Sequence, residues 1–214
     1  MLIDLHNHTF PMSDDSMMSP DEFVDAAKKS GLDGVCLTEH DRFWDAGAVA
    51  ELSKRHGILV LPGCEVTTEE GHLLVFGLSE YVFGMHSAAF VKRLVDEDGG
   101  TMLLAHPYRR MMLDDAFEEA IKRGLRSAVL RLVDGVEGLN GRGSERENEY
   151  AYQLGEMMSL RMPLGMSGGS DAHSLDDVGV CATEFERDIA SLDDLIRELR
   201  AGRFRPVRLR GEVQ

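Results

Sequence analysis

MLIDLHNHTFPMSDDSMMSPDEFVDAAKKSG, residues 1–31, holds the strand-and-helix unit from which the rest of the fold can be predicted. Its opening apolar run is typical of a short strand, and its later part carries the start and stop signals of a helix. Ser19 can act as the N-cap, with Pro20 at the first helical position, Glu22 placed to complete a capping box, and Gly31 beyond the end. The unit therefore predicts a strand that leads through an acidic turn into an amphipathic helix.

The same unit recurs along the chain. Strand-like apolar runs follow at 33–40, 57–68, 71–78, 100–107, 129–140 and 163–173, and helical patterns occupy 45–56, 87–97, 114–123, 144–161 and 191–201. Such alternation predicts a mainly parallel sheet. With about seven strands in 214 residues, we expect one α/β domain, 1–214, closed or nearly closed into a barrel. A doubly wound open sheet is the alternative, but no GxGxxG turn follows the first strand.

The charge of the chain bears on its partners. The formal net charge of −15 repels nucleic-acid backbones, because phosphate binding of that kind depends on clustered lysines and arginines. The basic cluster RAGRFRPVRLR, at 200–210, is better explained as a solvated edge strand than as a nucleic-acid footprint. We therefore expect no nucleic-acid partner.

Cysteine usage and hydropathy indicate the compartment. Cys36, Cys64 and Cys181 lie in apolar strand-like runs without CxxC spacing, which predicts buried free thiols and a reducing environment. No N-terminal stretch joins a basic region to an apolar core, and no apolar run approaches the roughly 20 residues needed to cross a bilayer. We expect a cytoplasmic protein with no membrane partner.

Residues with ligand chemistry gather at the carboxyl ends of the predicted strands, which form the functional face of an α/β barrel. His6 and His8 stand two apart, so both imidazoles point to one side of an extended chain, and Asp171 and His173 repeat this spacing. The remaining members are His40, Glu65, His106 and, at the start of its strand, His72.

Each of these residues alone is more often a hydrogen-bonded core or rim residue than a ligand. Together, six of the eight histidines and several carboxylates at one rim would be too costly to desolvate with nothing bound. Imidazole and carboxylate donors without thiolate suit zinc, manganese or iron. Two histidines have structural explanations, His56 at a helix C-terminus and His86 in a loop or at a helix start.

The motifs that hold these residues resemble those of a known family. They are DLHNHT with SDDS, LTEHD, GCEVTT with GHLLVFGL, LAHP and GGSDAH, and DGVEGLNGR is similar to the family's penultimate strand. Five motifs in order resemble the polymerase and histidinol phosphatase (PHP) superfamily of metal-dependent phosphoesterases. The resemblance covers essentially the whole chain and implies a distorted (β/α)7 TIM-like barrel.

The resemblance also implies two or three divalent ions, manganese, zinc or iron. By position, one would be held by His6, His8, Glu65 and Asp171, a second by His72 and His106 with Glu65 as the bridge, and a third by Asp15, His40 and His173. Asp15 is preferred to Asp14 because Ser13 stands two residues before it, as in the family pattern. Several relatives have histidine at this position.

The reaction expected of such a site is phosphate-ester hydrolysis. Closely spaced divalent ions lower the pKa of a bridging water and stabilise the attacking and leaving oxygens. Glu65 would set the metal spacing, Asp171 would orient the hydroxide, and His173 would help to bind the phosphate oxygens. The expected substrate is a small phosphomonoester of the sugar phosphate, nucleotide or histidinol phosphate type.

Three residues near the same rim are candidate substrate contacts. Arg109 and Arg142 could clamp phosphate in a bidentate manner, or lie at the surface. Asn140 could contact substrate, or belong to the start of the following helix, which we favour slightly. Glu39 precedes His40 and should turn to the opposite face, which suits a supporting or structural role.

Two other functions remain open from the sequence. A phosphodiesterase or exonuclease should show a basic groove, which the net charge gives little reason to expect. A non-catalytic metal-binding PHP module is disfavoured because all expected ligand positions are filled. The oligomeric state is not predicted.

Overall fold

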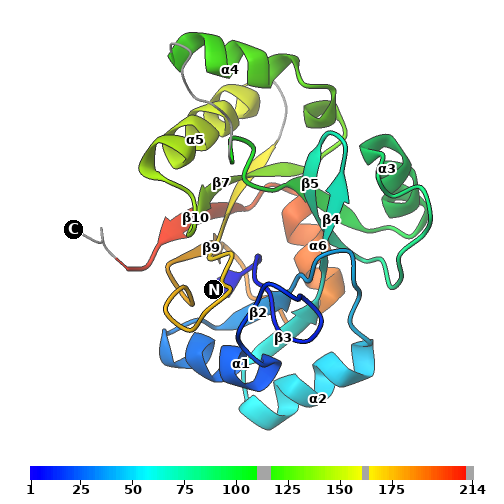
Figure 1. Ribbon diagram of the computed structural model, residues 1–214, viewed down its shortest axis with the longest axis vertical. Helices are drawn as coiled ribbons and strands as arrows, with labels where there is room; N and C mark the ends of the chain where they lie inside the picture. The colour runs from blue at the N-terminus through cyan, green and yellow to red at the C-terminus, as the bar shows by residue number, and fades with distance from the viewer. Residues whose placement is uncertain (110–116, 161–163, 211–214) are drawn as a thin grey trace.

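The computed structural model describes residues 1–109, 117–160 and 164–210 (Figure 1). Its strands are β1 (Leu2–Asp4), β2 (Gly34–Leu37), β3 (Leu59–Pro62), β4 (Cys64–Thr68), β5 (Gly71–Phe76), β6 (Thr101–Leu104), β7 (Gly135–Asn140), β8 (Gly165–Gly169), β9 (Cys181–Phe185) and β10 (Phe204–Arg208). Its helices are α1 (Pro20–Lys29), α2 (Ala46–His56), α3 (Ala88–Glu97), α4 (Phe117–Arg126), the 3-10 helix η1 (Ala128–Arg131), α5 (Glu145–Ser159) and α6 (Leu192–Arg200).

The strands form two five-stranded sheets, in the orders β10-β9-β1-β2-β3 and β4-β5-β6-β7-β8. The α/β class is therefore confirmed. The expectation of a mainly parallel sheet is wrong, because the pairs β1–β9, β9–β10, β4–β5 and β5–β6 are antiparallel. The reason is local for β4 and β5, since a turn of two residues, Glu69 and Glu70, can only reverse the chain.

The two sheets meet along two lines. On one side β3 runs through Gly63 into β4, and an isolated bridge joins His40 to Glu65. On the other side the backbone N–H of Gly168 donates to Thr183 Oγ1 at 3.0 Å, and that hydroxyl donates to the Gly168 carbonyl at 2.8 Å. Across the described ranges the strand-pairing ladders of the two sheets do not join into one closed sheet. The TIM-like barrel therefore remains a prediction.

Two of the expected strands are interrupted. The run 57–68 divides at Gly63, where an added Cβ would lie 2.8 Å from a ring carbon of Phe76 and 2.9 Å from the Thr38 methyl group. The run 129–140 begins as η1 and becomes a strand only at Gly135. The first helix agrees with expectation, because Ser19 caps α1 in a capping box with Glu22. The expected start of the helix 114–123, and Pro163 of the last predicted strand, lie outside the described residues.

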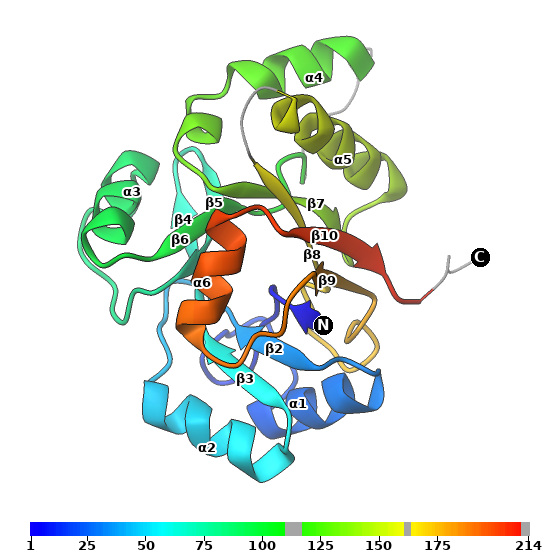
Figure 2. The ribbon, with the colours of Figure 1, turned by 180° about the vertical axis from the view of Figure 1, so that it is seen from behind.

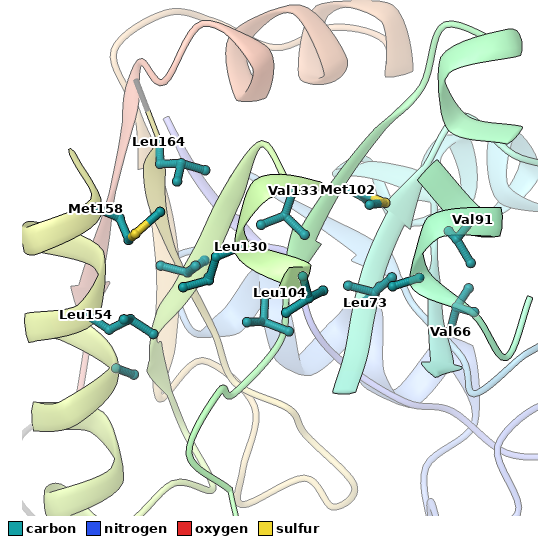
Figure 3. Close-up of a cluster of buried hydrophobic side chains, with 14 of the residues drawn as sticks. Val66, Leu73, Val91, Met102, Leu104, Leu130, Val133, Leu154, Met158 and Leu164 are labelled. Carbon is teal, nitrogen blue, oxygen red and sulfur yellow. The ribbon is translucent and has the colours of Figure 1, made fainter. Parts of the chain in front are cut away.

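Helices cover the outer faces of both sheets. In Figure 1, α1 and α2 lie below the sheet that contains β2 and β3, and α4 and α5 lie above β7. Figure 3 shows the core beneath α3, η1 and α5, where Val66 and Leu73 meet Val91, and Leu130 approaches Leu104.

Helix α6 contacts both sheets, as the reverse view shows (Figure 2). Its Leu195 and Leu199 belong to one buried cluster with Leu5 at the end of the first strand and Phe76 of β5. Phe76 pairs with Thr101, at the start of β6. The opposite end of β6 is therefore left for the candidate site.

Candidate metal centre

The candidate ligands come together at one rim of the two sheets. His6 and His8 follow β1, His40 follows β2, His106 follows β6, and Asp171 and His173 follow β8. Glu65 lies in β4 and His72 in β5. Because β5 is antiparallel to β4, with Thr67 opposite His72, the start of β5 lies at the same rim as the ends of the parallel strands. This explains why the one histidine at a strand start still joins the group.

Glu65 lies at the middle of the cluster, and its side chain is 1% exposed. Its Oε2 lies near three imidazole nitrogens, His6 Nε2 at 3.3 Å, His8 Nε2 at 3.2 Å and His40 Nδ1 at 3.0 Å. Its Oε1 lies near two more, His72 Nδ1 at 2.8 Å and His106 Nε2 at 2.9 Å. One carboxylate therefore faces five histidines, which suits the bridging role that the family resemblance implies.

Asp171 faces the same centre from the other side. Its Oδ1 lies 3.3 Å from His8 Nε2 and 3.6 Å from His6 Nε2. Asp15 lies further out and is half exposed, with Oδ2 3.0 Å from His173 Nε2 and 3.4 Å from His40 Nε2. All nine predicted ligands thus form one continuous cluster.

Within the described part of the chain, three buried atoms of this cluster lack a hydrogen-bond partner, namely His6 Nε2, His8 Nε2 and Glu65 Oε2. Orphaned buried polar atoms are costly, and here they converge from the segment that follows β1 and from β4. Their chemistry, imidazole nitrogen with carboxylate oxygen, suits a divalent metal ion. The residues present therefore fit a divalent metal centre.

Four sets of residues could each hold an ion, because their ligand atoms lie within 4.8 Å of one another. They are His8–His40–His173, His6–His8–Asp171, His6–Glu65–His106 and His40–Glu65–His72. The sequence-based assignment places His72 and His106 on one ion, whereas these sets associate His106 with His6 and His72 with His40. How nine ligands divide among two or three ions stays a prediction.

The mutual electrostatics of these groups are strong. Burial lowers the pKa of His6, but Asp171, Glu137 and Glu65 outweigh it and raise that pKa well above its ordinary value. Burial likewise opposes the charge on His8, yet its carboxylate partners raise its pKa to about 9. Burial would raise the pKa of Glu65, but the imidazoles hold it well below its ordinary value. The carboxylates thus draw positive charge to this centre, as protons or as a cation in their place.

Backbone strain also concentrates at this rim. In the described ranges the non-glycine residues with positive φ are Asp41 at 51°, His106 at 23° and Asp171 at 51°. Two are candidate ligands and the third directly follows His40. Such conformations persist where the surrounding structure fixes them, and they cluster at functional sites.

Glu137 is a functional candidate that the sequence reasoning missed. It lies in β7, is fully buried, and its Oε1 is 2.9 Å from His6 Nδ1. Its Oε2 accepts from the backbone N–H of His106 at 2.8 Å and from Asn140 Nδ2 at 3.0 Å. Glu137 thereby turns His6 Nε2 toward the centre, as supporting carboxylates do for metal-bound histidines. The available signal was a lone acid in the apolar run GVEGLN.

Glu39 supports the opposite side of the centre. This buried carboxylate accepts from Thr9 N at 2.8 Å, Ser13 Oγ at 2.6 Å and Trp44 Nε1 at 3.0 Å. Ser13 Oγ in turn lies 3.3 Å from His8 Nδ1. The prediction that Glu39 faces away from the ligands and supports them agrees with these contacts.

The predicted substrate contacts have different surroundings. Arg109 donates to Asp171 Oδ2 at 2.5 Å and to Asn140 Oδ1 at 2.6 Å. Asn140 is buried and also donates to Asp171, while Ser144 caps α5, so the favoured placement of Asn140 at a helix start gives way to a position in the centre's hydrogen-bond network. Arg142 is exposed, and no described residue pairs with its guanidinium.

A cavity of about 640 Å³ opens onto the centre. Its wall includes Asp15, His40, Glu65, His72, His106, Asp171 and His173, together with both candidate arginines, Arg109 and Arg142. The cavity therefore gives a ligand access both to the cluster and to Arg142, which has no ion-pair partner among the described residues.

The basic cluster at 200–210 belongs to the edge of a sheet. β10 is the last strand of its sheet, Arg203 pairs with the buried Glu198 at 2.6 Å, and Arg208 pairs with Glu145 at 2.8 Å. Arg205 pairs with Glu184. These contacts agree with the edge-strand interpretation.

The remaining expectations concern residues away from the centre. Cys36, Cys64 and Cys181 are buried free thiols, as predicted. His56 ends α2, and His86 precedes Ser87, the N-cap of α3. Among the described helices, none is both long enough and apolar enough to span a bilayer.

The fold and the site together define an α/β domain with a histidine- and carboxylate-lined candidate metal centre. Residues 4–122 match the model of the PHP domain, and residues 148–204 match a PHP-associated model. The chain belongs to the PHP domain family, so the resemblance noted from its motifs is confirmed.

Three relatives illustrate the similarity. An uncharacterised protein of Methanocaldococcus jannaschii is 30% identical over 120 residues, which are 50% of this chain and 68% of the relative. The structure of PsfC from Pseudomonas syringae is 18% identical, with a TM-score of 0.67 over 96% of this chain and 90% of that one. A two-domain protein from Bacteroides vulgatus that contains a predicted PHP-like metal-dependent phosphoesterase is 21% identical, with a TM-score of 0.69. The match covers 97% of this chain and 64% of that protein.

Proposed function

We propose that the protein is a metal-dependent phosphoesterase that hydrolyses a small phosphomonoester of the sugar phosphate, nucleotide or histidinol phosphate type. The observation that carries this proposal is the set of three buried atoms without a hydrogen-bond partner among the described residues, His6 Nε2, His8 Nε2 and Glu65 Oε2. Of these three residues, Glu65 lines a cavity that Arg142 also lines. A cation fits the three buried ligand atoms, and a phosphate oxygen fits the guanidinium of Arg142.

Two or three divalent ions bound here, manganese, zinc or iron, would supply positive charge for a phosphate and would make water a nucleophile near neutral pH. His6, His8, Glu65 and Asp171 would hold the inner position, with Glu65 shared outward toward His72 and His106. Asp15, His40 and His173 would hold the outer position beside the cavity mouth. The family name of the Bacteroides vulgatus relative supports this chemistry.

The side chains themselves would orient the reactants. Asp171 is fixed by Arg109 and Asn140, so its Oδ1 is aimed at the histidines and can accept a hydrogen bond from the attacking water. Arg142, exposed and unpaired among the described residues, would bind the non-reacting phosphate oxygens. Because Asp171 is held by these contacts before substrate arrives, its carboxylate needs little reorganisation in the reaction.

Phosphate release tests the proposal. The purified protein would be stripped of metal, reloaded separately with manganese, zinc or iron, and assayed on phosphomonoesters and phosphodiesters. His6→Ala should abolish metal-dependent release, whereas His86→Ala, at a histidine outside the centre, should retain it. Faster turnover of diesters would instead favour the phosphodiesterase. No release with any loaded metal would exclude the enzyme and favour a metal-binding module.

A further inference from the structure

The cavity extends well beyond the candidate metal centre. Its volume of about 640 Å³ is within the range of pockets that enclose a drug-sized ligand, roughly 300–1,000 Å³, and exceeds what a phosphate group needs. The part of its wall away from the histidines comes from β6, α4, η1 and α5. This part of the wall is mainly apolar, whereas the part at the metal centre carries histidines and carboxylates.

We call this part the apolar arm and define it by Leu104, Gly124, Ser127, Val129, Leu130 and Leu154. Its four aliphatic side chains are 1–5% exposed. Figure 3 shows that Leu104, Leu130 and Leu154 come from a strand, a 3-10 helix and an α-helix that surround one region of the core. The walls are thus fixed by core packing.

Among the residues that the structure describes, few polar groups face this arm. The hydroxyl of neighbouring Tyr108 donates to the Ala120 carbonyl at 3.2 Å, so it is engaged by the protein itself. Arg123 borders the arm but is exposed at its rim. The acids Glu69 and Glu70 line the cavity at the β4–β5 turn, beside His72 and on the side of the metal centre.

From this division we infer that the substrate is a phosphomonoester whose alcohol carries an uncharged apolar group, an aryl ring or a branched alkyl chain, seated in the apolar arm. The inference rests on the proposed function, which places the phosphate at the metal centre. Burial of an apolar group against these walls is favourable, whereas sugar hydroxyls would lose their water partners there. Of the proposed substrate types, a simple sugar phosphate fits this cavity least.

Two matched ligand pairs test the arm. Ethyl phosphate and 2-phenylethyl phosphate both release a primary alkoxide, so their reactivity is similar and a difference in kcat/KM reports the contact with the alcohol. We expect 2-phenylethyl phosphate to be preferred by about tenfold or more. The corresponding phosphonates, which are not hydrolysed, give the same comparison as dissociation constants by calorimetry on the metal-loaded protein.

A variant locates the preference. Ser127 makes no capping hydrogen bond to η1, so Ser127→Trp should fill the arm without removing a contact. This variant should lose most of the preference for the phenylethyl ligands and keep its activity on ethyl phosphate. Ala128→Trp, at the exposed neighbouring position outside the cavity wall, is the control and should behave as the wild type.

The outcomes separate the inference from the proposed function. Equal kcat/KM for the two esters, or equal affinity for the two phosphonates, would contradict binding of an apolar group in the arm. Neither result would contradict phosphatase activity. Preference for the phenylethyl phosphonate without any turnover would support the arm and refute the enzyme. If Ser127→Trp fails to fold, as its melting curve would show, the ligand pairs on the wild-type chain still decide the matter.

Discussion

His6 Nδ1 lies 2.9 Å from Glu137 Oε1, across 131 positions of sequence, and both side chains are fully buried. The contact fixes which imidazole nitrogen carries the proton, because the carboxylate can only accept. In the neutral imidazole that a bound cation would require, His6 Nε2 is then left as the lone-pair donor, beside Glu65 and Asp171. The orientation of a candidate ligand is thus set by a residue on another strand.

Glu137→Gln should weaken metal binding by roughly 10- to 100-fold, which is the usual effect of removing a supporting carboxylate. The measurement is manganese or zinc affinity by calorimetry, independent of any substrate. Glu149→Gln, an exposed acid on α5, is the control and should bind metal as the wild type does. Wild-type affinity in Glu137→Gln would show that Glu137 has only a packing role.

Gly169→Ala should disturb the same contact sterically. A Cβ at this position would lie 2.4 Å from His6 Cβ and 2.8 Å from Glu137 Oε1, so one of the two side chains must move. We expect both a lower melting temperature and weaker metal binding. Gly138→Ala, where the nearest atom to the added Cβ is Met166 Sδ at 3.4 Å, should change neither by much. Unchanged metal affinity in Gly169→Ala would indicate that the centre tolerates displacement of His6.

Arg142→Ala should raise KM for a phosphomonoester by about tenfold, because a guanidinium–phosphate contact is a charge-assisted hydrogen bond. Metal affinity should stay the same, since Arg142 contacts none of the candidate ligands in the described structure. Arg131→Ala, at an exposed arginine outside the cavity wall, provides the comparison in steady-state kinetics. Equal KM values for the two variants would remove Arg142 from the substrate site.

His56 should make stability depend on pH. Hydrogen bonds that the His56 ring donates to Asp21 and Asp25, each 2.7 Å away, raise the pKa of His56 above 6.5 in the folded protein. The stabilisation is therefore complete below pH 6.5 and is lost as the pH rises through the raised value. In melting experiments, His56→Gln should be less stable than the wild type at pH 6, and the difference should shrink at pH 9. A difference that grows with pH would contradict this linkage.

The sequence predicts those parts of the fold that depend on local chemistry. The Ser19 and Glu22 capping box is formed within four residues, and the two-residue spacing of His6 and His8 is enough to place both imidazoles on one side. The antiparallel pairing of β4 and β5 was missed although the sequence holds the signal, since the predicted runs 57–68 and 71–78 are two residues apart and parallel strands need a longer crossover. Glu137 was missed because its meaning depends on His6, which only tertiary packing brings near.

The candidate centre takes ligands from both sheets. His6, His8 and His40 follow strands of one sheet, and Glu65, His72 and His106 belong to the other, while the ladders of the two sheets do not join across the described ranges. A cation held between them would act as a further cross-link between the sheets, beside the backbone hydrogen bonds that join Asp171 to His6 and Asp41 to Glu65. The metal would then be a component of the folded scaffold as well as of its chemistry, and the melting temperature of the protein would report how fully it is loaded.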